Sequence, residues 1–331
     1  MRLIDLIRDK RSVSIIGMCK NAGKTTALNR LIEEHRYNEG VLALTSIGRD
    51  GENVDIVTHT NKPGIFIYEN TLIATAQGLL RYCDATREIL ETTGMNTPLG
   101  EVVILRALSD GSVQIAGPSM TEQLKRAADM FFTLGADRVI IDGAVSRKSL
   151  CAPAVADGTI LCTGASYSKS MIAVAEDTAF AAELLTLQHT AFDLSFETPA
   201  RITVTTEDGE YIPLTQNDTL PEIMKKLPGV SGVWLRGALT ESSLAALLRA
   251  GVSMEGVEII VEDASKLLIT KETYRKLRAR GGRIRVRESA SLCAVTVNPF
   301  SAYGYHFDKD AFIDVMRKSV QVPVINVMEE L

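Results

Sequence analysis

The sequence has few cysteines and few aromatic residues. Five cysteines are scattered over 331 residues, no two of them spaced as C-x-x-C, and aromatic residues make up 5% of the chain. Paired cysteines mark zinc sites and redox motifs, and disulfide-rich secreted domains carry denser, even sets. We therefore expect no zinc site and no disulfide framework, and we expect the reducing environment of the cytoplasm.

Long apolar runs and an excess of positive charge are also absent. No stretch approaches the ~18 consecutive apolar residues of a membrane span, and residues 1–13 carry charges throughout instead of a signal-peptide core. The formal net charge is −5. We therefore expect neither a membrane nor a nucleic acid as partner. The one basic run, residues 275–287, is typical of a solvated helix, a Gly-Gly turn and a strand with exposed arginines.

Strand-like and helix-like patterns alternate along the whole chain, which predicts an α/β protein. The length favours two domains. We predict an N-terminal domain over residues 1–190, with a mostly parallel sheet flanked by helices, and a smaller α/β domain over residues 200–331. The boundary falls near residues 189–200, where the periodicity is lost and Pro199 occurs.

The individual elements follow from the spacing of apolar residues. Helices are predicted over residues 24–35, 71–80, 120–134, 168–187, 240–250, 270–280 and 308–317. Strands are predicted over residues 13–18, 41–47, 64–68, 138–141, 159–163, 232–235, 257–261, 283–286, 294–297 and 324–327. Residues 102–105 and 113–116 are predicted to pair as a hairpin around a Ser-Asp-Gly-Ser turn.

One segment, VSIIGMCKNAGKTTALNRLI at residues 13–32, combines an apolar strand, a glycine-containing loop, GKTT and a helical pattern. A phosphate-binding loop needs backbone N–H groups that face an anion and a helix N-terminus behind them. Gly23 lets the backbone approach the phosphates, Lys24 supplies a mobile positive charge, and Thr25 supplies a hydroxyl for Mg²⁺. The segment therefore predicts a nucleotide site at Cys19, Lys20, Asn21, Ala22, Gly23, Lys24, Thr25 and Thr26, with Lys24 also catalytic.

The spacing of the loop departs from the common G-x-x-x-x-G-K-[ST] pattern. Five residues separate Gly17 from Gly23, so Met18 stands where the first glycine is usual. Either Gly17 takes over its role by a shift of one residue, or the turn uses a residue other than glycine. Because Cys19 lies inside the loop, we expect its oxidation or alkylation to block nucleotide binding.

The stretch GMCKNAGKTTALNRLI resembles the P-loop of the SIMIBI class of NTPases and is similar to those of the molybdopterin-guanine-dinucleotide accessory protein and of dethiobiotin synthetase. The resemblance covers roughly residues 10–188, and residues 200–331 match no family. It implies that the strand after the P-loop helix, here VLALTSIGRDGE, is the sheet neighbour of the P-loop strand and delivers carboxylates toward Mg²⁺. It also implies a dimer with nucleotide at the interface, where Lys20 would act.

Two carboxylates are candidates for the metal site. RVIIDGA is a hydrophobic strand that ends in Asp142, as Walker B logic requires, so Asp142 is predicted to hold Mg²⁺ together with Thr25 and to act in catalysis. The alternative is a solvated aspartate in a strand-end turn. Asp50, in the loop after the second strand, is the second metal candidate. Arg147 and Lys148 either bind an anionic substrate or are surface charges.

The base of the nucleotide is less constrained. Guanine recognition usually involves N/T-K-x-D, but NKPG at residues 61–64 lacks the aspartate and lies too early in the chain. We therefore favour ATP, with Mg²⁺, over GTP.

Three functions remain open. The first is an accessory NTPase that serves as a switch, chaperone or reactivator for a metabolic or cofactor-dependent enzyme, through a partner protein or a homodimer. Aromatic residues at 297–308 offer it a partner contact, unless they pack within the protein. The second is a ligase or kinase for a small anion, with further anion sites at residues 117–123, where Ser119 would cap a helix, and at residues 163–170; ordinary helix caps explain both equally. The third is a non-catalytic, nucleotide-sensing interaction protein.

Overall fold

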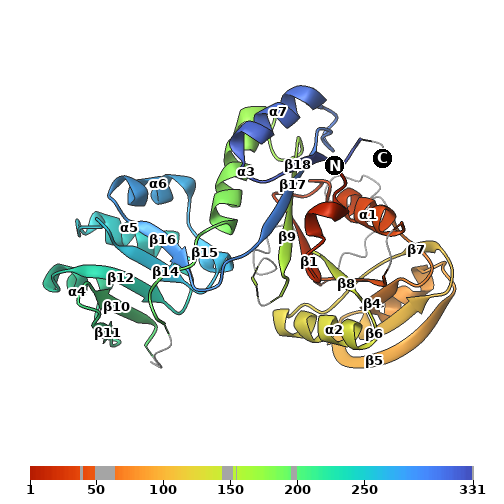
Figure 1. Cartoon of the computed structure of the whole chain (residues 1–331), viewed down its shortest axis with the longest axis horizontal. Coiled ribbons are helices and arrows are strands. Elements are labelled where there is room, and N and C mark those ends of the chain that lie inside the picture. Colours follow the sequence, from red (N-terminus) through yellow and green to blue (C-terminus); the bar gives the residue numbers. More distant parts are fainter. Residues whose placement is uncertain (38–39, 49–63, 144–151, 154, 195–199, 330–331) are drawn as a thin grey trace. The chain divides into compact units, whose positions relative to one another are not determined.

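A computed structural model describes the chain except residues 38–39, 49–63, 144–151, 154, 195–199 and 330–331 (Figure 1). The chain divides into two compact units. Unit 1 comprises Met1–Ala182 and Ser291–Leu331, and unit 2 comprises Glu183–Ala290. Among the described helices, none combines the length and apolar character that a bilayer span requires.

Unit 1 is built around a nine-stranded sheet with the order β18-β17-β9-β1-β8-β2-β4-β6-β5. The strands from β18 to β4 are parallel, and β6 and β5 continue the sheet in antiparallel pairs. Their bounds are β1 Ser12–Gly17, β2 Leu42–Ser46, β4 Leu72–Ala76, β5 Arg87–Thr97, β6 Gly100–Ala107, β8 Arg138–Asp142, β9 Gly158–Gly164, β17 Leu292–Asn298 and β18 Val324–Asn326. A small antiparallel ribbon joins β3 (Ile65–Ile67) to β7 (Gly111–Val113).

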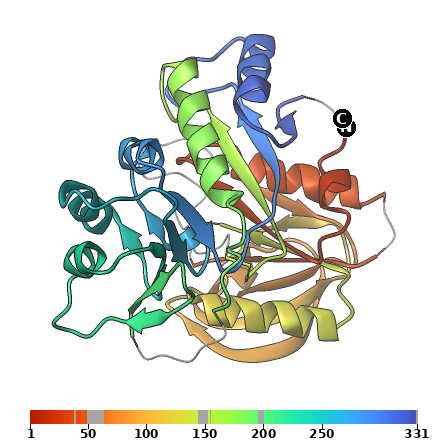
Figure 2. The same ribbon diagram turned by 60° about the vertical axis from the view of Figure 1, so that its left-hand side comes forward.

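The central strands of this sheet are buried along almost their whole length, as expected for a parallel sheet that helices cover. All six residues of β1 are buried. The helices of unit 1 are α1 Lys24–His35, α2 Thr121–Thr133, α3 Met171–Leu185, which runs on into unit 2, and α7 Lys309–Ser319, with 3₁₀ turns at Ile4–Ile7 and Gln77–Tyr82. Figures 1 and 2 show α1 and α2 on opposite sides of the central strands. Unit 1 is therefore a mixed α/β structure with a large, mostly parallel sheet flanked by helices.

Unit 2 has its own five-stranded sheet with the order β11-β10-β12-β14-β16. Strands β12, β14 and β16 are parallel, and β10 and β11 are antiparallel additions. Its elements are β10 Ile202–Thr206, β11 Tyr211–Pro213, α4 Leu220–Lys226, β12 Val230–Leu235, β13 Leu239–Thr240, α5 Glu241–Arg249, β14 Glu258–Val261, a 3₁₀ turn Ala264–Lys266, β15 Leu267–Leu268, α6 Lys271–Ala279 and β16 Arg283–Val286. Thr240 and Thr270 cap α5 and α6 by accepting hydrogen bonds from Ser243 N and Thr273 N.

The second domain expected over residues 200–331 differs from the observed unit 2. Residues 291–331 belong to unit 1, where β17 pairs with β9 and β18 with β17. The strands and helix predicted at the end of the chain are present, but they extend the first sheet. Local periodicity identifies a strand or helix but does not indicate which sheet it joins. The sequence pattern therefore could not predict that residues 291–331 rejoin the sheet of unit 1.

Three predictions about local structure or strand order are wrong. Residues 71–80 form β4 and a 3₁₀ turn instead of a helix, because β4 is buried on both faces and its apolar run carries no strand alternation. The predicted hairpin of residues 102–116 does not form: β6 pairs with β4 and β5, and β7 pairs with β3. Strand β2 is not the neighbour of β1, since β8 lies between them.

Candidate functional site

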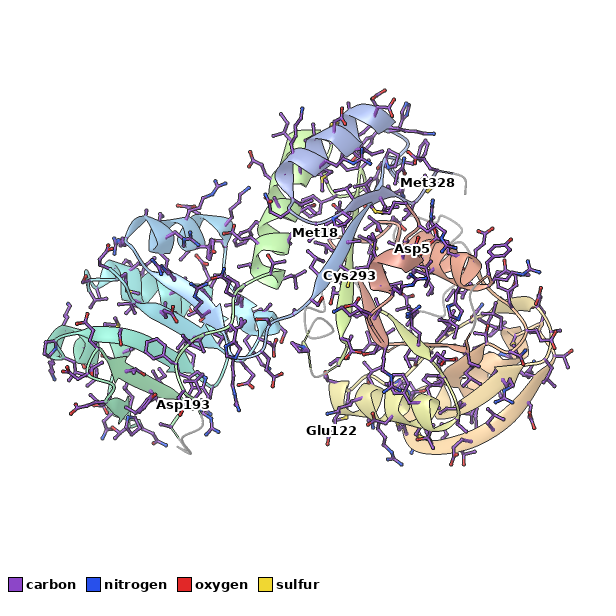
Figure 3. All side chains as sticks on the ribbon, in the orientation of Figure 1. Asp5, Met18, Glu122, Asp193, Cys293 and Met328 are labelled. Carbon is purple, nitrogen blue, oxygen red and sulfur yellow. The ribbon has the colours of Figure 1, made fainter. Side chains whose placement is uncertain are left out.

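The candidate site lies at the carboxyl edge of the parallel strands of unit 1. Because these strands all point the same way, their last residues share one edge of the sheet, which is where α/β proteins bind ligands. The last residues are Gly17 of β1, Asp142 of β8, Ser46 of β2, Gly164 of β9 and Asn298 of β17. Residues 18–23, the 18–23 loop, leave this edge and lead into α1. Figure 3 labels Met18, where the loop begins.

The backbone of the 18–23 loop is folded back on the sheet. Met18 N–H donates to Cys162 O at 2.9 Å, which ties the start of the loop to β9. Asn21 and Gly23 then have positive φ angles of 58° and 89°. Asparagine is one of the few residues other than glycine that tolerates this conformation. Residues with left-handed conformation among right-handed ones build the concave backbone nests that bind anions.

Gly17 and Asn21 differ in the part they play in the loop. Gly17 has no positive φ, but a Cβ atom on it would lie 3.1 Å from Lys24 Cδ and 3.2 Å from Lys24 Cγ. Gly17 therefore provides space for the Lys24 side chain. The left-handed conformation in this part of the loop belongs to Asn21, a residue other than glycine.

Helix α1 begins at Lys24, and its N-cap residue makes no side-chain hydrogen bond to the helix. Its N-cap residue is Gly23, which has no side chain to cap the helix, and no acidic residue lies in the first turn. Ala27 N–H makes the first helical hydrogen bond, to Gly23 O at 2.9 Å. The N–H groups before it have no partner within the helix, and the helix dipole adds positive potential there. Thr25 and Thr26, in the first turn, are half-buried.

Asp142 is held beside this loop by the strands on both sides. It is aligned with Ile15 of β1 and Ser46 of β2, and it is 4% exposed. Gly143 N–H donates to Ile15 O, and Ile47 N–H donates to Asp142 O. A buried aspartate at a strand end replaces the solvated turn aspartate that was the alternative interpretation.

The pKa shifts of two cysteine thiols reflect the charges near the loop. Burial raises the pKa of Cys162 to about 12; the charge of Lys24 lowers it and that of Asp142 raises it. Both charged groups therefore lie near the same buried sulfur at the base of the loop. Burial also raises the pKa of Cys19 to about 11, with Lys24 again opposing the shift.

The far side of the loop is closed by residues that sequence reasoning missed. A Cβ atom on Gly23 would lie 3.2 Å from Asn298 Cβ and 3.5 Å from Val327 Cγ2. A Cβ atom on Gly164 would lie 2.5 Å from Asn298 O. Asn298 at the end of β17 and Val327 after β18 thus pack directly against Gly23, and Gly164 at the end of β9 packs against Asn298. No motif marks Asn298, because its position depends on a strand that joins the sheet from the end of the chain.

The structure shows no helix cap at the expected second anion site and contacts within the protein at the third. Helix α2 has Met120 as its N-cap residue and no side-chain cap, so Ser119 does not cap it. Ser170 Oγ instead accepts a hydrogen bond from Ala173 N and caps the start of α3. Ser166 Oγ accepts a hydrogen bond from Ala302 N.

The aromatic segment after β17 is partly buried and partly exposed. Tyr305 Oη donates to Ala165 O at 2.6 Å, and the Phe307 ring packs edge-on against Phe312. Phe300 and Tyr303 are 41% and 61% exposed. Packing within unit 1 therefore accounts for two of the four aromatic residues.

Several predicted site residues lie outside the described part of the chain: Asp50, Arg147 and Lys148, together with residues 61–63 of the NKPG stretch. Within the described part, no group of three or more His, Cys, Asp or Glu side chains is arranged to hold a metal ion. Lys20 is described and is exposed. Comparisons with protein-family models, curated proteins and solved structures found no match for the chain.

Proposed function

We propose that unit 1 is a P-loop NTPase of the SIMIBI type that binds and hydrolyses Mg·ATP at the 18–23 loop and the first turn of α1. The observation that carries this proposal is the position of Lys24. Its side chain lies across Gly17 at the start of a helix whose N-cap residue, Gly23, has no side chain. A lysine held there meets a phosphate group that is bound by the N–H groups of the helix start.

The residues at the site fit a nucleotide with its metal ion. Gly23 has no side chain between the loop and Asn298, and the first N–H groups of α1 have no helical partner. The Thr25 hydroxyl and the Asp142 carboxylate are oxygen donors of the kind that Mg²⁺ prefers. When bound, Mg²⁺ would neutralise charge on the phosphate oxygens. Asp50 stays a proposed third donor.

Each residue then has a defined task in hydrolysis. The loop N–H groups hold the phosphates in place, and Lys24 stabilises the negative charge that develops on the transferred phosphoryl group. Thr25 and Asp142 would hold the metal ion. The described residues of this chain suggest no base for the attacking water. Lys20 of a second copy, which carries a positive charge, would stabilise charge on the phosphates across a dimer interface.

We further propose that the chain is a cytoplasmic accessory NTPase for a metabolic or cofactor-dependent enzyme. Unit 2 is a separate unit, and Phe300 and Tyr303 are exposed on the segment that follows Asn298 at the edge of the site. A partner protein could contact these rings. ATP is favoured because no N/T-K-x-D motif follows in a suitable place. The ligase or kinase alternative is weakened, since Ser166 and Ser170 are engaged within the protein.

Hydrolysis measured with and without small anions tests this function. We expect slow basal release of phosphate from Mg·ATP that is abolished in Lys24→Ala and retained in Lys125→Ala, which removes an exposed lysine of α2. Turnover that requires an added small carboxylic acid and consumes it would favour the ligase or kinase instead. Binding of nucleotide without any turnover would favour the nucleotide-sensing protein.

A further inference from the structure

Unit 2 contains a cavity that the nucleotide site does not explain. Its volume is about 390 Å³, and it lies between the end of α3, α6 and β16. The residues that line it all belong to Glu183–Ala290: Glu183, Thr186, Leu187, Gln188, Tyr274, Arg278, Arg283, Ile284 and Arg285. Three arginines against one glutamate make this lining positively charged.

A tight turn brings two of these arginines together. Helix α6 ends with hydrogen bonds from Gly282 N to Leu277 O and from Gly281 N to Arg278 O, the pattern of a Schellman motif. Gly281 has a φ of 83°, which favours glycine. Strand β16 starts at the next residue, Arg283, so Arg278 and Arg283 face the same cavity from two adjoining elements.

The third arginine is fixed by its neighbours. Arg283 and Arg285 are two residues apart on β16 and point to the same face, while Ile284 between them is buried. Arg285 Nε lies 3.3 Å from Glu258 Oε1, and Arg285 also donates to the side chain of Gln188. Its guanidinium is therefore held in one orientation at the wall of the cavity.

The glutamate of the lining is directed toward a tyrosine. Tyr274 is 3% exposed, and its Oη donates to Glu183 Oε1 at 2.9 Å. Burial, followed by the interaction with Glu183, raises the pKa of Tyr274 to about 12, so the phenol keeps its proton at neutral pH. Arg278 in turn donates to Tyr274 Oη at 3.4 Å. The tyrosine thus links the carboxylate to the arginine side of the cavity.

Two arginines of the cavity retain uncompensated charge. Arg285 and Arg287 of β16 have carboxylate partners, Glu258 and Glu262. Within the described part of unit 2, no carboxylate lies at ion-pair distance from Arg278 or Arg283. Exposed arginines are common on protein surfaces, but these two converge on one cavity beside a third that is held rigidly.

We propose that this cavity binds a small organic anion, a metabolite that carries a phosphate or carboxylate group. The arginine guanidinium presents a planar fork of N–H donors that matches both oxyanions. A volume of about 390 Å³ is in the range of small-molecule sites and exceeds the space that an inorganic ion needs. Leu187 gives the remainder of the molecule an apolar contact. This site is independent of the nucleotide site.

Calorimetric titration of the full-length chain with glycerol 3-phosphate, citrate and inorganic phosphate tests this site. Lys24→Ala is introduced in every variant so that the candidate phosphate loop does not compete. We expect binding of glycerol 3-phosphate or of citrate, which distinguishes a phosphate site from a carboxylate site. Arg278→Gln and Arg283→Gln should each weaken the binding about tenfold or more, because each removes a charged hydrogen-bond donor.

Arg275→Gln is the matched control, because Arg275 is an exposed arginine of α6 that does not line the cavity. Its affinity should equal that of the parent chain. Arg283→Lys keeps the positive charge but loses the planar pair of N–H donors. Its affinity should lie between that of the parent chain and that of Arg283→Gln. Absence of binding to all three probes at 10 mM, or equal weakening by Arg275→Gln, would overturn the proposal, provided that the thermal unfolding of the variants is unchanged.

Discussion

The side chain of Lys24 lies across Gly17, so that a Cβ atom on residue 17 would be only 3.1 Å from Lys24 Cδ. The glycine at the end of β1 and the lysine at the start of α1 are seven positions apart in sequence. The lysine side chain therefore runs from the start of α1 past the end of β1. The irregular spacing of the motif is therefore compatible with a lysine that is held over the loop.

Gly17→Val should displace Lys24 and weaken nucleotide binding. The Cβ atom of a valine would lie 3.1 Å from Lys24 Cδ and 3.3 Å from Cys19 O, and its methyl groups add further bulk beside the Lys24 stem. We expect the affinity for a non-hydrolysable ATP analogue to fall at least about tenfold, the loss typical of one charged hydrogen bond. Gly237→Val is the control, since its Cβ would meet nothing within 4 Å. Equal affinities in both variants would show that the lysine does not depend on this contact.

Gly23→Ala should destabilise unit 1 for two reasons. Its φ of 89° costs a residue with a side chain about 1–2 kcal/mol, and the new methyl group would press on Asn298 Cβ at 3.2 Å. Gly94→Ala separates the two effects, because Gly94 has a φ of 72° but open space around its Cβ. We expect the midpoint of urea unfolding to fall further for Gly23→Ala than for Gly94→Ala. The reverse order would mean that Asn298 moves freely away from the loop.

Asp142→Asn should remove the dependence of nucleotide binding on Mg²⁺. The amide keeps the shape of this buried side chain but loses the charge that attracts a hard cation. The affinity for the ATP analogue should then be the same with Mg²⁺ and with EDTA, whereas in the parent chain Mg²⁺ should raise it. Asp129→Asn, at an exposed position of α2, should behave like the parent chain. A retained Mg²⁺ effect in Asp142→Asn would assign the metal to other residues.

Cys19 should react slowly with iodoacetamide. Burial raises its pKa from 9.0 to about 11, and the reactive species is the thiolate. At pH 8 the thiolate fraction is then about 100-fold below that of an ordinary cysteine. The rate, followed by mass spectrometry, should rise with pH up to about 11. Alkylation at the rate of a free thiol at pH 8 would show that the loop opens. A block of nucleotide binding by alkylation stays a prediction.

Local sequence patterns predicted most of the individual elements of unit 1. The bounds of α1 are confirmed at Lys24–His35, because a glycine cap and apolar residues at helical spacing define both ends. The mostly parallel sheet follows from alternating strands and helices, and it is confirmed as well. Asp142 could be placed at a strand end because a short apolar run stops there.

What could not be predicted depends on contacts between distant segments. Strand β4 is buried on both faces and has no alternating pattern, so it was mistaken for a helix. The position of β17 beside β9 joins segments more than a hundred residues apart, and it brings Asn298 to Gly23. The cavity in unit 2 also depends on contacts between distant segments. The sequence pattern indicated only a solvated surface for the basic run, whereas the end of α3 lies beside that run and lines the cavity with it.

The most direct test of the central claim is a calorimetric titration with a non-hydrolysable ATP analogue and its GTP counterpart in the presence of Mg²⁺. The parent chain and Lys125→Ala should bind the ATP analogue with equal affinity and prefer it to the GTP analogue, and Lys24→Ala should lose the binding. Absence of binding to either analogue by the parent chain, or unchanged binding by Lys24→Ala, would contradict a phosphate-binding role for the 18–23 loop.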